Sequence, residues 1–341
     1  MKRLASHSLF WPGVTLALLI ALNAVVNPGF LSISLRDGHL YGNLVDILNR
    51  AAPLALVSAG MTLVIAVRGL DISVGAVVAI TAAVAAVLIG GSLNLTPGAE
   101  AVSRFPLWLA LVAALGVATL CGVWNGALVV GVGMQPIIAT LILMVAGRGI
   151  AQLITGGQIL TIYYPPYFFL GNGFLFGLPF AAVLATSTIL VLHAALSLTP
   201  LGLFIRAIGI NPVAARIAGV RARPITIALY AFCGLTAGLA GLIISSNVKS
   251  ADANNAGQLL ELDAILAVTL GGTALTGGKF NLAGTALGAL IIQTLTSTIY
   301  SLGVPPEVNL VFKAALIFVV MLLQSADFRA TVRRLVTRPA E

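Results

Sequence analysis

Apolar stretches of membrane-crossing length dominate this sequence. The 341-residue chain is 59% hydrophobic and only 8% charged, whereas a soluble domain carries about 25% charged residues. The missing charge indicates that lipid covers most of the surface, so we expect one all-α membrane domain over residues 1–341 with about ten transmembrane helices. The expected spans cover residues 10–26, 51–67, 74–91, 107–130, 136–155, 178–197, 225–246, 259–274, 281–300 and 308–324.

The positions of Lys and Arg give the orientation. The first apolar stretch follows Lys2 and Arg3 and has no small-x-small cleavage site after it, so we interpret it as a span that is not removed as a signal peptide. With the N-terminus inside, twelve of the 18 Lys and Arg residues fall in cytoplasmic segments and four fall outside. Because basic residues are enriched in cytoplasmic loops, we expect both termini in the cytoplasm.

The net charge of +8 does not indicate a nucleic-acid partner. The basic residues lie in short segments between apolar runs, where they serve as topology signals and contact lipid headgroups. The expected surroundings of the chain are therefore the bilayer and other proteins.

Glycine pairs four residues apart occur inside three of the expected spans. They are Gly122/Gly126, Gly234/Gly238 and Gly284/Gly288. In lipid, small residues at this spacing let two helices approach closely, and van der Waals packing then holds them together. The pairs predict a compact bundle of helices.

Two polar, glycine-rich breaks interrupt the apolar pattern, at residues 68–75 and 271–279. Glycine tolerates the backbone angles of tight reversals, and non-helical backbone at membrane depth occurs where it is buried in protein or lines a cavity. The residues that mark the breaks are Gly69, Asp71, Gly75, Gly271, Gly272, Gly277 and Gly278.

The second break ends in Gly278-Lys279, which invites comparison with a phosphate-binding loop. That motif needs a glycine five residues before Gly278 and a Ser or Thr after the lysine. Thr273 and Phe280 occupy these positions. We therefore expect no nucleotide site in this chain.

Other catalytic or metal chemistry has little support. Cys121 and Cys233 lie in apolar runs, and the three histidines are scattered, so we expect no catalytic residue, metal site or resident cofactor. His193 lies within a span, either as a packed residue or as a proton relay. The carboxylates nearest the spans are at their ends, which is a weak sign of an ion-coupled carrier.

The segment 198–224 is the longest one that we place in the cytoplasm. Asn211 is a good N-cap and Pro212 suits the first helical position, while Gly219 can end a helix. The pattern predicts a short helix over 212–218, in which Ala214 and Ala215 leave room for a partner. The residues alone leave open whether it docks into a groove of another protein or only connects two spans.

The motif Ala214-Ala215-x3-Gly219 resembles the coupling helix of bacterial ABC importer permeases, although Val213 stands where that family usually has an acidic residue. Further stretches resemble the ribose-type sugar permeases, a family that commonly has glycine where Arg68 stands. They are residues 69–75, 135–141, 261–265, 271–273 and 277–278. Residues 141–149 and 251–257 are more specifically similar to galactofuranose importer permeases.

The resemblance implies a permease subunit of an ATP-driven sugar importer in the bacterial inner membrane. It implies that Asn211, Pro212, Ala214, Ala215 and Gly219 couple the chain to an ATP-binding subunit, which would hold ATP and Mg. It also implies a periplasmic sugar-binding protein and a second permease chain, identical or paralogous. The alternative function is a stand-alone, ion-coupled secondary sugar carrier.

A path for a neutral, hydroxyl-rich sugar needs hydrogen-bonding groups rather than strong charge. Tyr163, Tyr164 and Tyr167 either stack on a sugar ring or are interfacial aromatics. Polar side chains within or near the spans either line the path or form bonds between helices. The candidates for the path are Asn125, Gln152, Gln158, Asn254, Asn255 and Gln293.

Overall fold

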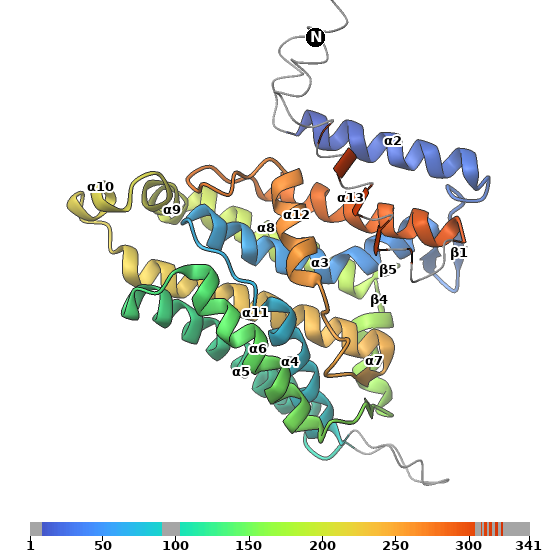
Figure 1. The fold of residues 1–341 in the computed structure, drawn as a ribbon. Helices are drawn as coiled ribbons and strands as arrows, with labels where there is room; N and C mark the ends of the chain where they lie inside the picture. Colours follow the sequence, from blue (N-terminus) through green and yellow to red (C-terminus); the bar gives the residue numbers. More distant parts are fainter. Residues whose placement is uncertain are drawn as a thin grey trace, which may run out of the picture.

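The chain folds into a bundle of helices, described here from a computed structural model (Figure 1). The structure describes residues 9–90 and 103–303, together with isolated positions between 308 and 322. In chain order the elements are α2 (Phe10–Val26), β1 (Ser34–Arg36), β2 (His39–Tyr41), α3 (Asn43–Ala66), α4 (Val74–Ile89), α5 (Leu107–Ala127), the π-helix η1 (Leu128–Val132), α6 (Pro136–Thr155), β3 (Leu160–Thr161), α7 (Pro165–Asn172), β4 (Phe174–Leu175), β5 (Leu178–Pro179), α8 (Phe180–Leu198), α9 (Leu201–Ile210), α10 (Pro212–Ile217), α11 (Ala222–Val248), β6 (Ser250–Ala251), α12 (Leu260–Leu270) and α13 (Leu282–Ser301).

The strands form three short antiparallel pairs. β1 pairs with β2, and β4 pairs with β5, each across a tight connection. β3 pairs with β6, so that Leu160 lies opposite Ala251. This pairing ties the segment that follows α6 to the segment that precedes α12.

Within the described part of the chain, six helices are long and apolar enough to cross a membrane: α3, α5 with η1, α6, α8, α11 and α13. These match six of the predicted spans, and α6 has the predicted bounds 136–155. The main difference is α3, which begins at Asn43 rather than at 51. The first turns of α3 contain the polar residues Asp46, Asn49 and Arg50, so this part of the helix does not appear as an apolar stretch in the sequence.

The sequence predicts ten spans, which is four more than these six helices. α2 has 17 residues and α4 has 16, and the expected span at 308–324 lies largely outside the described residues. α12 has only 11 residues, which is about 16 Å of helix at 1.5 Å per residue. It is shorter than the predicted 259–274, because the backbone before Leu260 is non-helical and Gly271 and Gly272 end the helix.

The core lies around α3 and α11. Of the most apolar part of α3, 83% is buried inside the protein, compared with 22% for α5 and for α8. α11 packs against α5, α3 and α4, and α3 also packs against α8, α12 and α13 (Figure 1). A helix that is apolar all round is a core helix when other helices surround it and faces lipid when they do not.

The glycine pairs lie where helices touch. A Cβ at Gly122 would overlap the backbone of Tyr230 on α11, and one at Gly234 would overlap the carbonyl oxygen of Ala118 on α5. In the same way, a Cβ at Gly288 on α13 would overlap the backbone of Ala267 on α12. The prediction of close packing at small residues is confirmed at all three pairs.

The two breaks interrupt helices within the bundle. In the first, Arg68 has a φ of 64°, a left-handed conformation that is unusual for a residue with a side chain. α4 then begins close to α12, since a Cβ at Gly75 would overlap both the Gly257 carbonyl oxygen and the Glu261 side chain. In the second break, Gly277 and Gly278 have left-handed φ angles of 83° and 89°.

We expect Gly234→Ala to destabilise the protein and Gly116→Ala to leave it intact. The new methyl group at position 234 meets a backbone oxygen that cannot move aside, and overpacking of this kind costs about 1 to 3 kcal/mol. Gly116 lies on an exposed face of α5 with nothing within 4 Å of a Cβ, and alanine is a better helix former there by roughly 1 kcal/mol. Thermal unfolding in detergent measures both effects, and equal melting temperatures for the two variants would contradict the packing described here.

Candidate functional site

The connection between α8 and α11 folds into two short helices at one end of the bundle, α9 and α10 (Figure 1). Asn211 lies at the corner between them, and its Oδ1 accepts hydrogen bonds of 3.0 Å from the amides of Val213 and Ala214. Pro212 is the first helical residue, and Gly219 follows the helix with a φ of 84°. The predicted short helix is thus present, over 212–217 rather than 212–218.

The two alanines of this helix have different surroundings. Ala215 is only 4% exposed because it packs against the chain itself, whereas Ala214 is exposed. Val213 is 67% exposed and Ile217 is 83% exposed. Since residues four apart share a helix face, these two side chains form an apolar stripe on the outer surface of α10.

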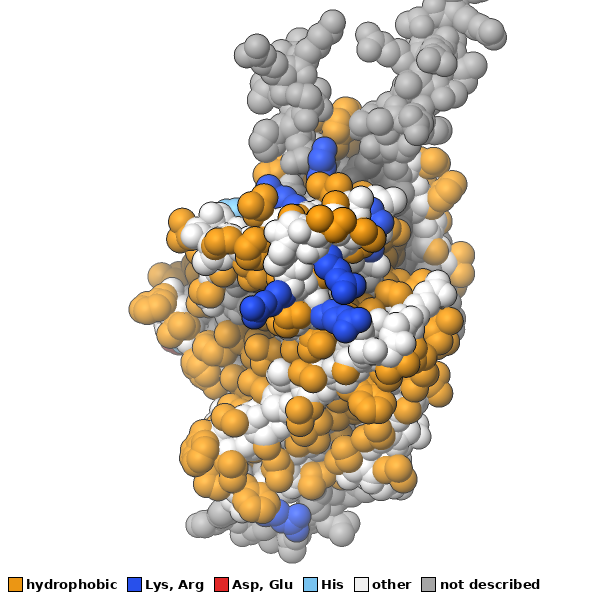
Figure 2. All heavy atoms as spheres, turned by 90° about the vertical axis from the view of Figure 1, so that its left-hand side faces the viewer, with side chains coloured by type: hydrophobic (Ala, Val, Ile, Leu, Met, Phe, Trp, Pro, Cys, Tyr) orange, Lys and Arg blue, Asp and Glu red, His pale blue; other side chains and the backbone are white. Residues whose placement is uncertain are grey.

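Basic side chains surround this end of the bundle. Figure 2 shows several Lys and Arg side chains among apolar ones on this face, without a visible acidic side chain. The connection contributes Arg206, Arg216, Arg221 and Arg223 and contains no Asp or Glu. Its positive field suits either lipid phosphates or an acidic rim on a partner protein.

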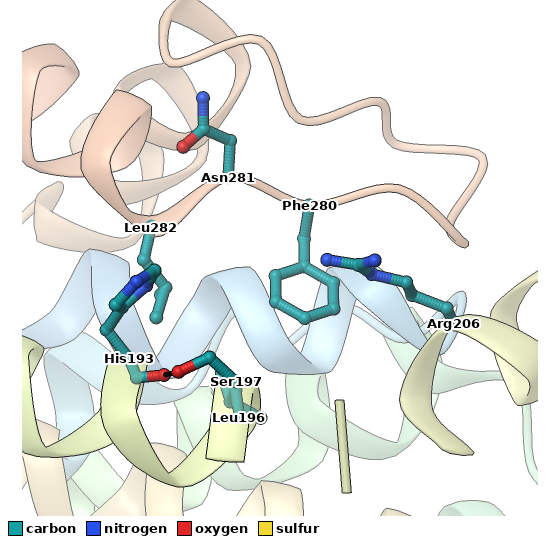
Figure 3. A pocket seen from close by; sticks show the side chains of 7 residues that line it. All are labelled: His193, Leu196, Ser197, Arg206, Phe280, Asn281 and Leu282. Carbon is teal, nitrogen blue, oxygen red and sulfur yellow. Dashed lines mark hydrogen bonds between the residues drawn. The ribbon is translucent and has the colours of Figure 1, made fainter. Parts of the chain in front are cut away.

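A small cavity lies between α8, α9 and the start of α13 (Figure 3). The guanidinium group of Arg206 lies over the ring of Phe280, 5.3 Å from its centroid. His193 lines the cavity from α8, and Ser197 donates a hydrogen bond of 2.8 Å to the His193 carbonyl oxygen. Among the residues that the structure describes, no carboxylate lines this cavity. The residues that line it are His193, Leu196, Ser197, Arg206, Phe280, Asn281 and Leu282.

A polar cluster joins α6 to the segment before α12. The Gln152 side-chain amide donates a hydrogen bond of 2.6 Å to Asn254 Oδ1. One turn earlier on α6, Arg148 donates from Nη1 to the carbonyl oxygens of Ala253, Asn254 and Ala256, the first at 3.2 Å and the second at 3.4 Å. These bonds satisfy backbone oxygens that belong to no helix or strand.

Asp252 organises the same segment. Its carboxylate accepts hydrogen bonds from the amides of Asn254 and Asn255, at 2.9 and 3.1 Å, and from the Asn255 side chain at 2.7 Å. Partial burial acts to raise the pKa of Asp252, but these hydrogen bonds and the charge of Arg148 outweigh it, so the pKa lies below its ordinary value. Asp252 is therefore an anion at neutral pH.

The structure brings together three of the six predicted path residues, Gln152, Asn254 and Asn255. Asn125 lies elsewhere and is fully buried, and it donates to Ser73 Oγ at 2.8 Å and to Asp71 Oδ1 at 3.2 Å. Of the remaining two, Gln158 is exposed in the connection after α6 and Gln293 is half-buried on α13. Asn125 thus bonds α5 to the first break.

The three tyrosines also separate. Tyr167 is completely buried, and its hydroxyl group contacts Ser245 Oγ and donates to the Leu242 carbonyl oxygen at 3.2 Å. Tyr167 therefore packs inside the bundle in this structure. Tyr163 is 39% exposed and Tyr164 is partly exposed.

The set of path candidates missed Arg148, which contacts more of the 252–257 segment than any of them. Its signal was present in the sequence, because an ionisable residue inside an apolar span marks a functional site by default. The described residues contain no group of three or more His, Cys, Asp or Glu side chains placed to hold a metal ion. The chemistry of this cluster is hydrogen bonding.

Comparison with known proteins places these features in context. Residues 43–321 match a family described as branched-chain amino acid transport system / permease component. The chain is 47% identical over 320 residues to the galactofuranose transporter permease protein YtfT of Escherichia coli (strain K12), covering 94% of this chain and 90% of that protein. No solved structure matches the chain.

Two other relatives are similar over nearly their whole length. The fructose import permease protein FruF of Bifidobacterium longum (strain NCC 2705) is 37% identical over 331 residues, which cover 95% of this chain and 90% of that protein. The ribose import permease protein RbsC of Escherichia coli (strain K12) is 35% identical over 316 residues, 92% of each chain.

Proposed function

The chain belongs to the family of branched-chain amino acid transport system permease components, and from this premise we propose that it is the permease subunit of an ATP-driven importer of a monosaccharide. The observation that carries the proposal is the 47% identity to a galactofuranose permease over 94% of this chain. Galactofuranose is therefore the first candidate substrate.

The polar cluster supports a sugar rather than an amino acid or an ion. Gln152, Asn254 and Asn255 offer amide groups that both donate and accept, which suits hydroxyl groups. A zwitterionic amino acid would need a fixed charge for each of its two ends. Arg148 and Asp252 are engaged with the protein's own backbone and side chains. The Gln152, Asn254 and Asn255 side chains also bond within the cluster, but each amide has more donor and acceptor positions than these bonds use, and those positions suit a sugar hydroxyl group.

The proposed complex divides the work among several chains. A periplasmic sugar-binding protein delivers the sugar at the outer side, a second permease chain completes the path, and ATP-binding subunits with ATP and Mg act from the cytoplasm. The proposed topology is a multi-pass protein of the bacterial inner membrane, with about ten spans in one domain and both termini inside. Coupling requires that ATP and the loaded binding protein favour different conformations of the path, because a ligand that binds two states equally shifts nothing.

We place the contact with the ATP-binding subunit at α10. The capped corner at Asn211 and Pro212, together with the turn at Gly219, holds a short helix at the end of the bundle. Val213 and Ile217 form its apolar stripe. The ABC importer permeases that the motif resembles usually have an acidic residue at the position of Val213. The partner groove that it fits is therefore apolar, with acidic groups at its rim for the surrounding arginines.

The alternative is an ion-coupled carrier that works alone. Mid-membrane acids are the usual sign of such a carrier. Asp71 accepts hydrogen bonds from Ser73 and Asn125, so its polar contacts come from the protein itself. Glu261 lies at the start of α12, beside Gly75, where its negative charge interacts with the positive charge of Arg148.

Reconstitution into liposomes tests the proposed function. We expect uptake of labelled galactofuranose only when the ATP-binding subunit, ATP and the sugar-binding protein are all present, with no uptake under an ion gradient alone. Fructose and ribose serve as matched competitors, and stronger competition by either one would move the substrate assignment to that sugar. Uptake by the chain alone, driven by a sodium or proton gradient, would establish the carrier instead.

We expect Ala214→Trp to abolish substrate-stimulated ATP hydrolysis by the assembled complex without unfolding the chain. Ala214 is exposed, so the indole ring fills the space that a partner would occupy, whereas a bulky residue at the buried Ala215 would disturb the chain's own packing. Leu18→Trp, at a 62% exposed position on α2, adds a bulky ring far from α10 and should leave hydrolysis unchanged. Wild-type stimulation in Ala214→Trp would mean that α10 does not receive the partner.

A further inference from the structure

Arg68 makes a tie between the first break and the helices of the cytoplasmic connection. Its Nε donates a hydrogen bond of 2.6 Å to the carbonyl oxygen of Gly209, and its Nη2 donates to that of Ile210. These two residues form the end of α9, where carbonyl groups lack partners within the helix. A guanidinium group at a helix C-terminus also interacts favourably with the helix dipole.

The tie holds the corner from which α10 starts. Ile210 is followed directly by Asn211, whose side chain caps α10. Arg68 therefore fixes the last carbonyl groups of α9 one residue before the cap of the next helix. A movement of α10 that shifts the end of α9 therefore pulls on the guanidinium group.

The backbone beside Arg68 is packed against both the second break and α9. The Gly278 amide donates a hydrogen bond of 2.8 Å to the carbonyl oxygen of Ala66. A Cβ at Gly209 would overlap that same oxygen, and one at Gly277 would lie 2.6 Å from Arg68 Cγ. Three segments far apart in the sequence thus meet at one junction, and Arg68 is its charged member.

On its other side, Arg68 leads into the buried part of the first break. The amide of Ile72 donates to Thr140 Oγ1 at 3.3 Å, and the Leu70 carbonyl oxygen accepts from the Tyr230 hydroxyl at 3.4 Å. Residues 70–73 are therefore held by α6 and α11, which span the membrane. A displacement of Arg68 can therefore be passed to α6 and α11 through residues 70–73.

The arginine keeps this position despite its backbone conformation. Its φ of 64° favours glycine, and glycine is what the ribose-type family commonly has here. A glycine would make the turn without the tie. The strained backbone conformation at Arg68 indicates that its side chain has a role beyond forming the turn.

We propose that Arg68 is a positioning residue that transmits movement of α10 to the first break, and so links ATP hydrolysis to the opening of the path. This proposal rests on the proposed function. It is specific to chains with a long cationic donor at this position, because the bonds to Gly209 and Ile210 come from the side chain. The Gly278–Ala66 hydrogen bond remains without it, so loss of Arg68 weakens coupling rather than abolishing it.

The variants Arg68→Ala and Arg68→Gly separate coupling from stability. Both remove the tie, but only alanine keeps the strained backbone, so Arg68→Gly should melt at a higher temperature than Arg68→Ala. In the reconstituted complex we expect both variants to lower the sugar imported per ATP hydrolysed, equally and at least about fivefold. Arg104→Ala, which removes an exposed arginine from the bend before α5, should keep the wild-type ratio.

Two transport results would overturn the proposal. One is a wild-type ratio of sugar imported to ATP hydrolysed in Arg68→Gly, and the other is a set of ratios that follows the same order as the melting temperatures. Hydrogen exchange supplies a second readout that needs no transport. Amides of residues 212–218 should exchange faster in both variants than in the wild-type chain, and unchanged exchange would overturn the proposal as well. If the wild-type complex imports no sugar, the proposed function fails, while the exchange experiment still decides the positioning role.

Discussion

A single constraint shapes this protein: backbone polar groups inside a bilayer have no water to bond to. Helices satisfy the constraint by themselves, and most of the chain is helical. The informative parts are those where the backbone is not helical. There, side chains and backbone groups from other segments bond to several of the backbone groups that no helix satisfies, and these partners are the residues on which the account depends.

Each of the main irregular segments has its own donors and acceptors. Thr140 and Tyr230 bond to the first break, and the second break bonds to the end of α3 through Gly278. Arg148 bonds to three carbonyl oxygens before α12. Because these partners come from other helices, the irregular segments also fix how the helices sit against each other. A movement at one end of the bundle therefore has bonded contacts through which it can reach the centre.

Much of the fold was accessible from the sequence, since lipid imposes a simple rule on length and composition. The bounds of α6, the glycine contacts between α5 and α11, and the helix after Asn211 all follow from local rules of hydropathy, small residues and capping. The start of α3 did not follow, because the polar residues Asp46, Asn49 and Arg50 look like the end of a span. The length of α12 did not follow either, because the helix ends at Gly271 although the apolar pattern continues past it. Hydropathy records composition and not where a helix begins or ends.

The site was less predictable, because it depends on which segments meet. Gln152 and Asn254 are 102 residues apart, and no local pattern joins them. Asn125 resembles them in the sequence but bonds to Asp71 and Ser73 in a separate buried network. The replacement of glycine by Arg68 could be noticed from the sequence, but its partners on α9 became visible only in three dimensions.

The claim on which this account rests most heavily is that α10 faces the cytoplasm. Labelling of a single cysteine at position 213 tests it, in a chain whose Cys121 and Cys233 are replaced by alanine. A membrane-impermeant maleimide added to intact spheroplasts should leave Val213→Cys unlabelled, and the same reagent should label it in inverted membrane vesicles. Labelling in intact spheroplasts would place this helix outside the cell and contradict the account.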